Sequence, residues 1–374
     1  AEYMGKHTLY ERSMTSASLG TGEDEAPIIP AICNDVALNI LARIPRLHYH
    51  SLSLVSKSFR SVIDSHLLYT TRSLIACARP FLYFCVRVPF PVPSILWFIL
   101  HLTPGSAPRP VSLPSAPNTL IGSAYTSVGP KIYVVGGSAA DIPSETVYSL
   151  DCRTHKWELA PSMHVAREFA AAGNVNGNVY VIGGCAADTR TRSRHWAEVF
   201  DPSTGIWSPV DRVEEVAVKE KWMHASAVMK GKIFAMADRG GVAYEPRTSR
   251  WEIVKGNMDL GWRGRACVVD GVLYCYDYLG KIRGYDAEGE DWKVLRGVDD
   301  KLPRFLCGAM LTDFGGNLVV TWEAKGGGNE TIICGAEITI RQEEEEIWGS
   351  VLWCNSFLTV PPRSSVLCCL SVIL

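Results

Sequence analysis

Residues 131–157 read KIYVVGGSAADIPSETVYSLDCRTHKW and contain the pattern that recurs through most of the chain. A strand-like segment with an aromatic residue at its end leads into Gly136-Gly137, and the acid Asp151 precedes Trp157 by six residues. Short apolar runs separated by turn-forming residues are typical of β-hairpins. The stretch therefore predicts one antiparallel repeat unit.

The same marks return further along the chain. The strand-like segments begin at Lys131, Asn178, Lys232, Val272 and Asn317, which are steps of 47, 54, 40 and 45 residues. The six-residue spacing of acid and tryptophan is kept in four pairs: Asp151 and Trp157, Asp201 and Trp207, Glu245 and Trp251, Asp286 and Trp292. Strand signals at such a period predict a β-propeller. We expect the glycines to turn the backbone near a central channel and the tryptophans to fill the space between blades.

Two further segments complete the expected ring. A fifth repeat covers residues 305–360, contains Trp348, and has solvated loops at Gly326–Gly328 and Glu343–Glu346. Residues 82–102 and 364–374 are strand-like. Prolines interrupt the first segment and the second is too short, so neither predicts a membrane helix. Joining both in one blade would remove exposed sheet edges. We therefore expect six blades over residues 80–374, closed by both ends of the region.

The segment that precedes the repeats is different in character. Residues 1–27 are polar, without the apolar core of a secretory leader, and predict a flexible tail. Residues 28–75 predict a helical module, with Asn34 or Asp35 capping a first helix that ends at Pro45 and a second helix over residues 49–64. So small a module cannot bury its whole apolar surface alone. It must dock on the rest of the chain or on a partner.

The helical module resembles a plant F-box. Residues 32–45, ICNDVALNILARIP, are similar to its opening, and residues 52–61, LSLVSKSFRS, to its second half. The resemblance implies binding to the Skp-type adaptor of a cullin–RING ubiquitin ligase. The implied adaptor-binding residues are Ile32, Asp35, Val36, Leu38, Leu41, Ile44, Pro45, Leu52, Val55, Lys57, Phe59 and Arg60. The family usually opens with Leu-Pro, whereas this chain has Ile32-Cys33, a departure that could weaken the adaptor contact.

The repeats, with their glycine doublet, acid and spaced tryptophan, resemble kelch repeats. Together the two resemblances imply an F-box/kelch-repeat protein that presents a target protein to an SCF-type ubiquitin ligase, with ubiquitin transfer left to partner subunits. We expect it in the cytoplasm or nucleus. About ten residues before four of the aromatic-ended strands, the chain should cross between blades on one common face. The residues at these crossings suit capture of an acidic protein segment: Arg167, Lys221, Trp222, Trp262, Arg263, Arg304 and Phe305.

The composition argues against nucleic-acid binding, membrane binding, metal binding and catalysis. The net charge is −2, so no basic field indicates a nucleic-acid or membrane partner. The 12 cysteines include no CxxC pair and are interpreted as small buried hydrophobes in a reducing compartment, and the nine histidines are mostly single. We therefore predict no metal, no cofactor and no catalysis. Two alternatives remain open, a scaffold with a weakened F-box and a kelch-fold oxidase or lyase.

Overall fold

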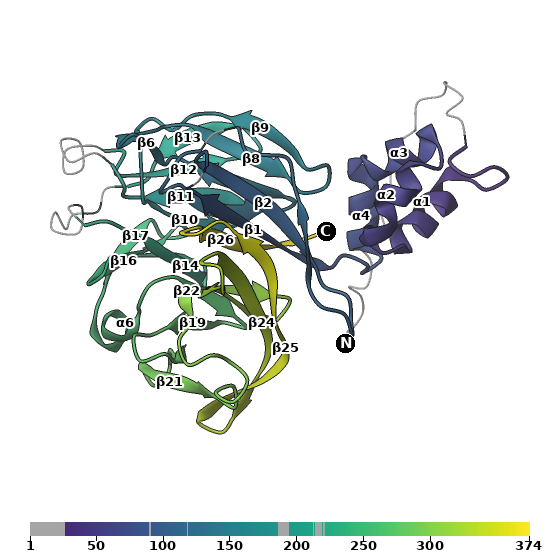
Figure 1. The fold of residues 1–374 in the computed structure, drawn as a ribbon. Helices are drawn as coiled ribbons and strands as arrows, with labels where there is room; N and C mark the ends of the chain where they lie inside the picture. The colour runs from purple at the N-terminus through teal and green to yellow at the C-terminus, as the bar shows by residue number, and fades with distance from the viewer. Residues whose placement is uncertain are drawn as a thin grey trace, which may run out of the picture. The chain divides into compact units, whose positions relative to one another are not determined.

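The chain is described from a computed structural model, which covers residues 27–89, 91–117, 119–185, 194–211, 213, 219 and 221–374. It divides into two compact units, residues 1–71 and residues 72–374. The first unit is helical, and the second consists of β-sheets arranged as a propeller (Figure 1). The predicted tail, apart from its last residue, lies outside the described residues. The domain limits 28–75 and 80–374 stay predictions.

The helical unit follows the predicted pattern with two differences. It contains the helices α1 (Asn34–Arg43), a 3-10 turn (Arg46–His48), α2 (Tyr49–Ser53) and α3 (Lys57–Ile63), and α4 (His66–Leu74) runs past its boundary. Among the described residues, no helix has the length and apolar character needed to span a membrane.

The two differences concern helix starts. The residue that caps α1 is Cys33, which makes no side-chain capping bond, and Asn34 Oδ1 instead accepts a backbone N–H from the segment before it. The helix predicted over residues 49–64 is divided in two. Ser56 is extended there and its Oγ accepts the backbone N–H of Phe59 at 3.1 Å, which begins α3 as a new helix.

The propeller unit is built from antiparallel four-stranded blades. Four blades are separate sheets, ordered β26-β1-β2-β3, β4-β5-β8-β9, β10-β11-β12-β13 and β14-β15-β16-β17. A fifth sheet has eight strands, in which the units β18-β19-β20-β21 and β22-β23-β24-β25 are joined by a short parallel pairing of β21 with β25. Divided at that pairing, the described sheets comprise six four-stranded units.

The strand bounds follow the repeat period. They are β1 Pro80–Val88, β2 Ser94–His101, β3 Arg109–Ser112, β4 Ala124–Val128, β5 Lys131–Val135, β8 Val147–Asp151, β9 Lys156–Ala160, β10 Ala171–Val175, β11 Asn178–Ile182, β12 Ala197–Asp201, β13 Ile206–Pro209, β14 Ala225–Met229, β15 Lys232–Met236, β16 Gly241–Glu245, β17 Arg250–Val254, β18 Ala266–Val269, β19 Val272–Tyr276, β20 Ile282–Asp286, β21 Asp291–Arg296, β22 Cys307–Phe314, β23 Asn317–Lys325, β24 Thr331–Glu343, β25 Glu346–Val360 and β26 Ser365–Ile373. A small ribbon pairs β6, Ser138–Ala139, with β7, Ile142–Pro143, and the short helix α6 spans Gly256–Gly261.

The ring closes as the sequence predicts. The C-terminal strand β26 pairs with β1 in antiparallel register from Pro80 and Ile373 to Arg87 and Ser365. Residues 82–102 and 364–374 are therefore strands of one blade, and Figure 1 shows the yellow C-terminal strand beside the dark blue first strands. Both ends of the propeller region thus share one sheet.

The repeated tryptophans hold each blade to the connection that enters it. Each donates its indole N–H to a backbone carbonyl 35 to 46 residues earlier in the chain: Trp157 to Pro114, Trp207 to Pro161, Trp251 to Asp211 and Trp292 to Asn257, at 2.6 to 3.0 Å. The preceding acids order the hairpin turns, since Asp151, Asp201 and Asp286 each accept the backbone N–H two residues later. The six-residue spacing thus sets both the turn and the contact between strand and entering connection.

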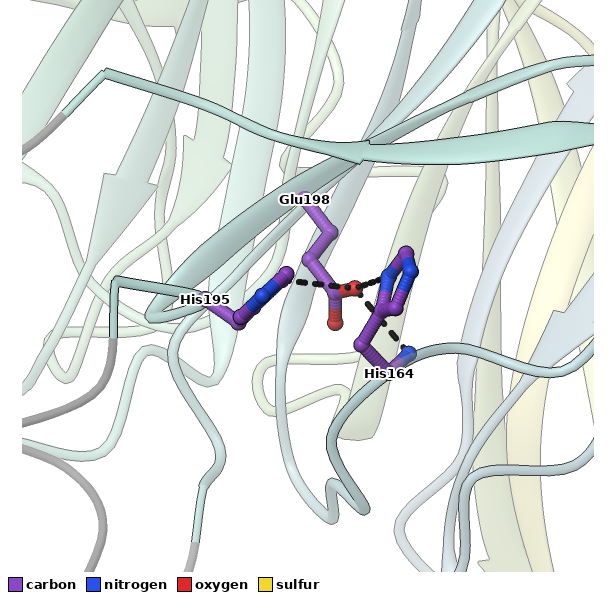
Figure 2. Close-up of side chains that lie close together, drawn as sticks. All are labelled: His164, His195 and Glu198. Carbon is purple, nitrogen blue, oxygen red and sulfur yellow. Dashed lines mark hydrogen bonds and ion pairs between the residues drawn. The ribbon is translucent and has the colours of Figure 1, made fainter.

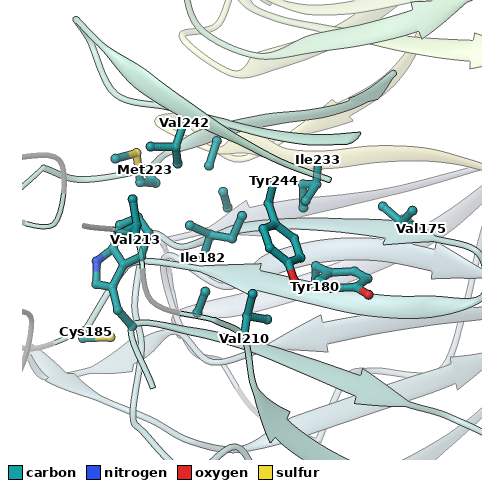
Figure 3. Close-up of a cluster of buried hydrophobic side chains, with 14 residues drawn as sticks. Val175, Tyr180, Ile182, Cys185, Val210, Val213, Met223, Ile233, Val242 and Tyr244 are labelled. Carbon is teal, nitrogen blue, oxygen red and sulfur yellow. The ribbon is translucent and has the colours of Figure 1, made fainter. Parts of the chain in front are cut away.

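Buried apolar side chains join neighbouring blades. Figure 3 shows one such cluster between the blades of β10–β13 and β14–β17, where Tyr180, Ile182, Ile233 and Tyr244 meet. Glycines permit the close approach of the connections, because a Cβ added at Gly136 would lie 2.4 Å from the Arg167 carbonyl oxygen. The predicted role of tryptophan is confirmed, because Trp207 and Trp251 pack in clusters that join neighbouring blades. The glycine doublet Gly136-Gly137 was expected near the channel, but it does not line it, and Gly136 instead permits close packing of two connections.

Replacing Trp207 by phenylalanine tests the indole hydrogen bond. The change removes the donor of a part-buried hydrogen bond to the Pro161 carbonyl, so we expect the free energy of unfolding to fall by about 0.5–1.5 kcal/mol in denaturant titration. The control is Trp348→Phe, because the Trp348 indole bonds only to the Glu346 side chain of its own hairpin, at 3.1 Å. Equal losses in the two variants would contradict the assignment.

Candidate functional site

The helical unit presents exposed apolar side chains. Of the residues implied by the F-box resemblance, Val36 and Val55 are exposed, whereas Leu38 and Leu41 are buried and support the surface from beneath. Ile40, which the helical pattern already placed on an apolar surface, is exposed as well. The structure adds two apolar side chains that sequence reasoning missed, Leu47 and Leu54, with Leu54 66% exposed. We call Val36, Ile40, Leu47, Leu54 and Val55 the apolar set.

The other implied residues differ in exposure. Asp35, Pro45, Lys57 and Arg60 are exposed, and Ile32, Ile44, Leu52 and Phe59 are half-buried. A small unit that exposes several large apolar side chains together with charged ones is suited to binding another protein.

The departure at Cys33 leaves the backbone unchanged. Cys33 has φ −66° and ψ 149°. Proline fixes φ near −65°, so the residue that the family usually has at this position would adopt the same conformation. What the chain lacks here is the proline ring itself.

The propeller unit contains a central channel. Its cavity has a volume of about 1270 Å³ and is lined by the innermost strands β4, β10, β14, β18, β22 and β26. A second hollow of about 390 Å³ shares Ile121, Phe169 and His224 with it. These shared residues precede channel strands, so the hollow adjoins the channel at the end where those strands begin.

This end of the channel carries aromatic and basic side chains. We call Phe169, Trp222, His224, Arg263, Tyr278 and Phe305, which line one or both hollows, the channel mouth. Arg263 lies over the Tyr278 ring at 5.9 Å, and Arg304 lies over the Phe305 ring at 5.4 Å. Phe169 packs edge-on against Trp222 with ring centroids 6.0 Å apart. Sequence reasoning found Trp222, Arg263, Arg304 and Phe305 but not Phe169, His224 or Tyr278.

Charge is unevenly spread around the channel mouth. Arg265 also lines the channel, so β18 and β22 are flanked by Arg263, Arg265 and Arg304. The nearby acid Asp277 is buried and forms an ion pair with Arg283, which compensates its charge. Glu323 also lines the channel, opposite Cys307 at the start of β22. With three arginines to this one acid, this side of the channel mouth is basic as well as aromatic.

Three predicted target-binding residues have other roles. Trp262 is buried and packs near Phe234, and the Lys221 ammonium donates to the Arg239 carbonyl at 2.8 Å. Arg167 is fully buried. The expectation that Arg167 and Trp262 face a target is thus corrected, because neither side chain reaches the surface.

Arg167 instead joins two blades. Its Nη1 donates to the carbonyls of Gly183 and Trp196 at 2.8 Å, and its Nη2 lies 2.7 Å from Glu198 Oε2 on β12. Its backbone bridges Ser144 of one blade and Cys185 of the next. A buried guanidinium needs this many acceptors because an uncompensated charge inside the protein is costly.

Two histidines lie close to the other carboxylate oxygen of Glu198, Oε1. His164 Nδ1 lies 2.6 Å and His195 Nδ1 3.4 Å from Oε1, and the two rings flank the carboxylate (Figure 2). Burial by itself raises the pKa of Glu198, but the charge of Arg167 and the hydrogen bonds from Arg167 and His164 outweigh it and lower the pKa. Glu198 is therefore held as a carboxylate.

The three side chains also have metal-ligand chemistry. Ligand atoms of His164, His195 and Glu198 all lie within 4.8 Å of one another. Two contacts argue against a metal ion between these side chains. Arg167 already compensates the charge of the Glu198 carboxylate. His195 Nε2 accepts a hydrogen bond from Arg194 at 3.4 Å, so the Nδ1 atom that faces Glu198 carries the ring proton and cannot bind a metal ion. We interpret the cluster as an ion-pair network at a blade junction.

The lowered pKa of Glu198 predicts a pH dependence of stability. The stabilisation from the carboxylate is present above its ordinary pKa of 4.5 and is lost as the pH falls through the lower folded-state value. At pH 7 we expect the free energy of unfolding of Glu198→Gln to be about 3 kcal/mol lower than that of the unaltered chain. Denaturant titrations at lower pH should show this difference shrinking towards pH 3. Glu158→Gln, in an exposed pair with Lys131, is the control and should change little. A pH-independent difference for Glu198→Gln would contradict the network.

Comparisons with known proteins agree with both units. The F-box domain model matches residues 29–71, and the model described as FKB95, Kelch-repeats domain, matches residues 97–358. Three F-box/kelch-repeat proteins of Arabidopsis thaliana are 38%, 35% and 34% identical to the chain, covering 91%, 91% and 89% of it and 93%, 89% and 89% of their own lengths. The solved structure of YjhT aligns with a TM-score of 0.49 over 68% of this chain and 91% of its own, at 12% identity. The chain therefore belongs to the F-box/kelch-repeat family.

Proposed function

We propose that this chain is the substrate-recognition subunit of an SCF-type ubiquitin ligase. The F-box would bind a Skp-type adaptor and through it a cullin–RING ligase, and the propeller would hold a target protein for ubiquitination. Ubiquitin transfer would belong to the partner subunits, so the chain contributes proximity and no chemistry. Its place of action would be the cytoplasm or nucleus.

The observation that carries the adaptor half is the apolar set on a unit that matches an F-box. Leu54 and Val55 are neighbours in sequence and 66% and 64% exposed. Covering side chains of this size is worth about 1.5–3 kcal/mol each. An adaptor that buries them would draw part of its binding free energy from these two side chains.

Charge introduced into the apolar set should break the adaptor contact. We expect Leu54→Glu with Val55→Glu to weaken binding of a purified Skp-type adaptor by more than about tenfold, because each carboxylate would be buried without a partner. Isothermal titration calorimetry measures the affinity. The control is Leu159→Glu, which alters an equally exposed leucine on the propeller. Unchanged affinity in the double variant would sink the adaptor assignment.

The channel mouth supports the target half. Arginine and aromatic side chains carry much of the binding energy in protein interfaces. Arg263 and Arg304 each lie over an aromatic ring, and Phe305 and Tyr278 are 61% and 79% exposed. The arrangement favours a target segment in which an acidic residue adjoins apolar ones.

Charge reversal at the channel mouth should remove target binding and leave adaptor binding intact. We expect proximity labelling by the full chain to lose its target proteins in Arg263→Glu with Arg304→Glu while the Skp-type adaptor stays labelled. The matched control reverses Arg247 and Arg250, two exposed arginines at the hairpin of β16 and β17. If the mouth variant labels the same proteins as the unaltered chain, targets are bound elsewhere.

A further inference from the structure

Two cysteines face each other where the ring closes. Cys85 on β1 and Cys368 on β26 are direct partners in the antiparallel register, although 283 residues separate them in sequence. Both are buried, and their Sγ atoms lie 3.1 Å apart. The fold therefore brings two thiols together across the strand pair that closes the propeller ring.

The backbone is already suited to a covalent link. Facing residues of antiparallel strands have Cα atoms roughly 4.5–5.5 Å apart, inside the range of about 4.4–6.8 Å that disulfides tolerate. The register shifts between Cys85 and Val86, because Val86 pairs with Val366 and leaves Leu367 as an extra residue. Such a bulge loosens the ladder locally. Small rotations of the two side chains can then bring the sulfurs to bonding distance.

One of the two cysteines belongs to the wall of the central channel, although its side chain is buried. Cys368 is among the residues that line the central channel. Burial raises the pKa of its thiol well above the ordinary value of 9.0. Since the thiolate is the reactive form, oxidation should be slow at neutral pH and faster as the pH rises.

We propose that Cys85 and Cys368 form an oxidation site at which a disulfide locks the propeller ring. With hydrogen peroxide as the oxidant, the Cys368 sulfur attacks a peroxide oxygen, breaks the O–O bond and becomes a sulfenic acid as one water leaves. The Cys85 sulfur then displaces the hydroxyl from Cys368, forms the S–S bond and releases a second water. Two thiols lose two electrons and two protons, and one peroxide is reduced to two waters.

The Cys85–Cys368 disulfide would hold the first and last strands of the propeller together. A disulfide between residues so far apart in sequence strongly restricts the unfolded chain. It also prevents β26 from separating from β1 while the bond lasts. The inference does not depend on the proposed ligase role, because it rests on the closing strands alone.

Peptide mapping of the oxidised protein tests the proposal. The full chain is treated with hydrogen peroxide at pH 8, its remaining thiols are alkylated, and proteolytic fragments are analysed by mass spectrometry. We expect a cross-linked pair of peptides containing Cys85 and Cys368 that dithiothreitol separates, and a thermal midpoint about 5 °C or more above that of the reduced protein.

Two variants complete the test. Cys368→Ser should lose both the cross-link and the thermal shift, whereas Cys354→Ser, which removes an exposed thiol on β25, should keep both. Recovery of Cys85 and Cys368 as separate alkylated or over-oxidised peptides would overturn the proposal, as would a Cys368–Cys369 link. If Cys368→Ser does not fold, the map of the unaltered chain decides alone.

Discussion

Pairing of β26 with β1 is the constraint on which the propeller depends. Blades pack side by side, so a ring that lacked one strand at its junction would expose a sheet edge and leave neighbouring blades half covered. The last residues of the chain supply the innermost strand of the first blade. This closure completes the wall of the channel, which β26 lines together with five other inner strands. The channel mouth exists only because the ring is closed.

Within the ring, polar contacts reinforce the junctions between blades. The tryptophan N–H groups reach the connections that enter each blade, and Arg167 binds one connection to the strand β12 of the next. Arg167 and Glu198 are both buried, so their junction is specific as well as apolar. Phe305 and Arg304 are exposed at the same end of the channel, which suits them to recognition.

Sequence patterns predicted the features that local spacing determines. The six residues from acid to tryptophan define a hairpin whichever blade it occupies, so the propeller and its closure by both ends could be expected. Ser56 shows the limit at short range, because its capping bond divides a helix whose apolar periodicity continues across it. Leu38 and Leu54 show a second limit, since both are apolar helical-unit residues and only packing makes one buried and the other exposed.

Contacts between distant residues could not be predicted from one sequence. Arg167 stands at the same repeat phase as Arg263, yet it is buried because Glu198, 31 residues later, supplies its countercharge. His164 and His195 meet at that carboxylate for the same reason, although each looked isolated in sequence. Cys85 and Cys368 become partners only through the register of the closing strands. For Arg167, His164 and Cys85 the deciding partner lies 31, 34 and 283 residues further along the chain.

The two units have distinct surfaces, an apolar set on the F-box and a basic aromatic mouth on the propeller. Hydrogen–deuterium exchange of the full chain, with and without a purified Skp-type adaptor, tests this division of roles most directly. The account predicts slower exchange within residues 29–71 on adaptor binding and unchanged exchange in the channel strands. Protection confined to the propeller, or none at a saturating adaptor concentration, would contradict it.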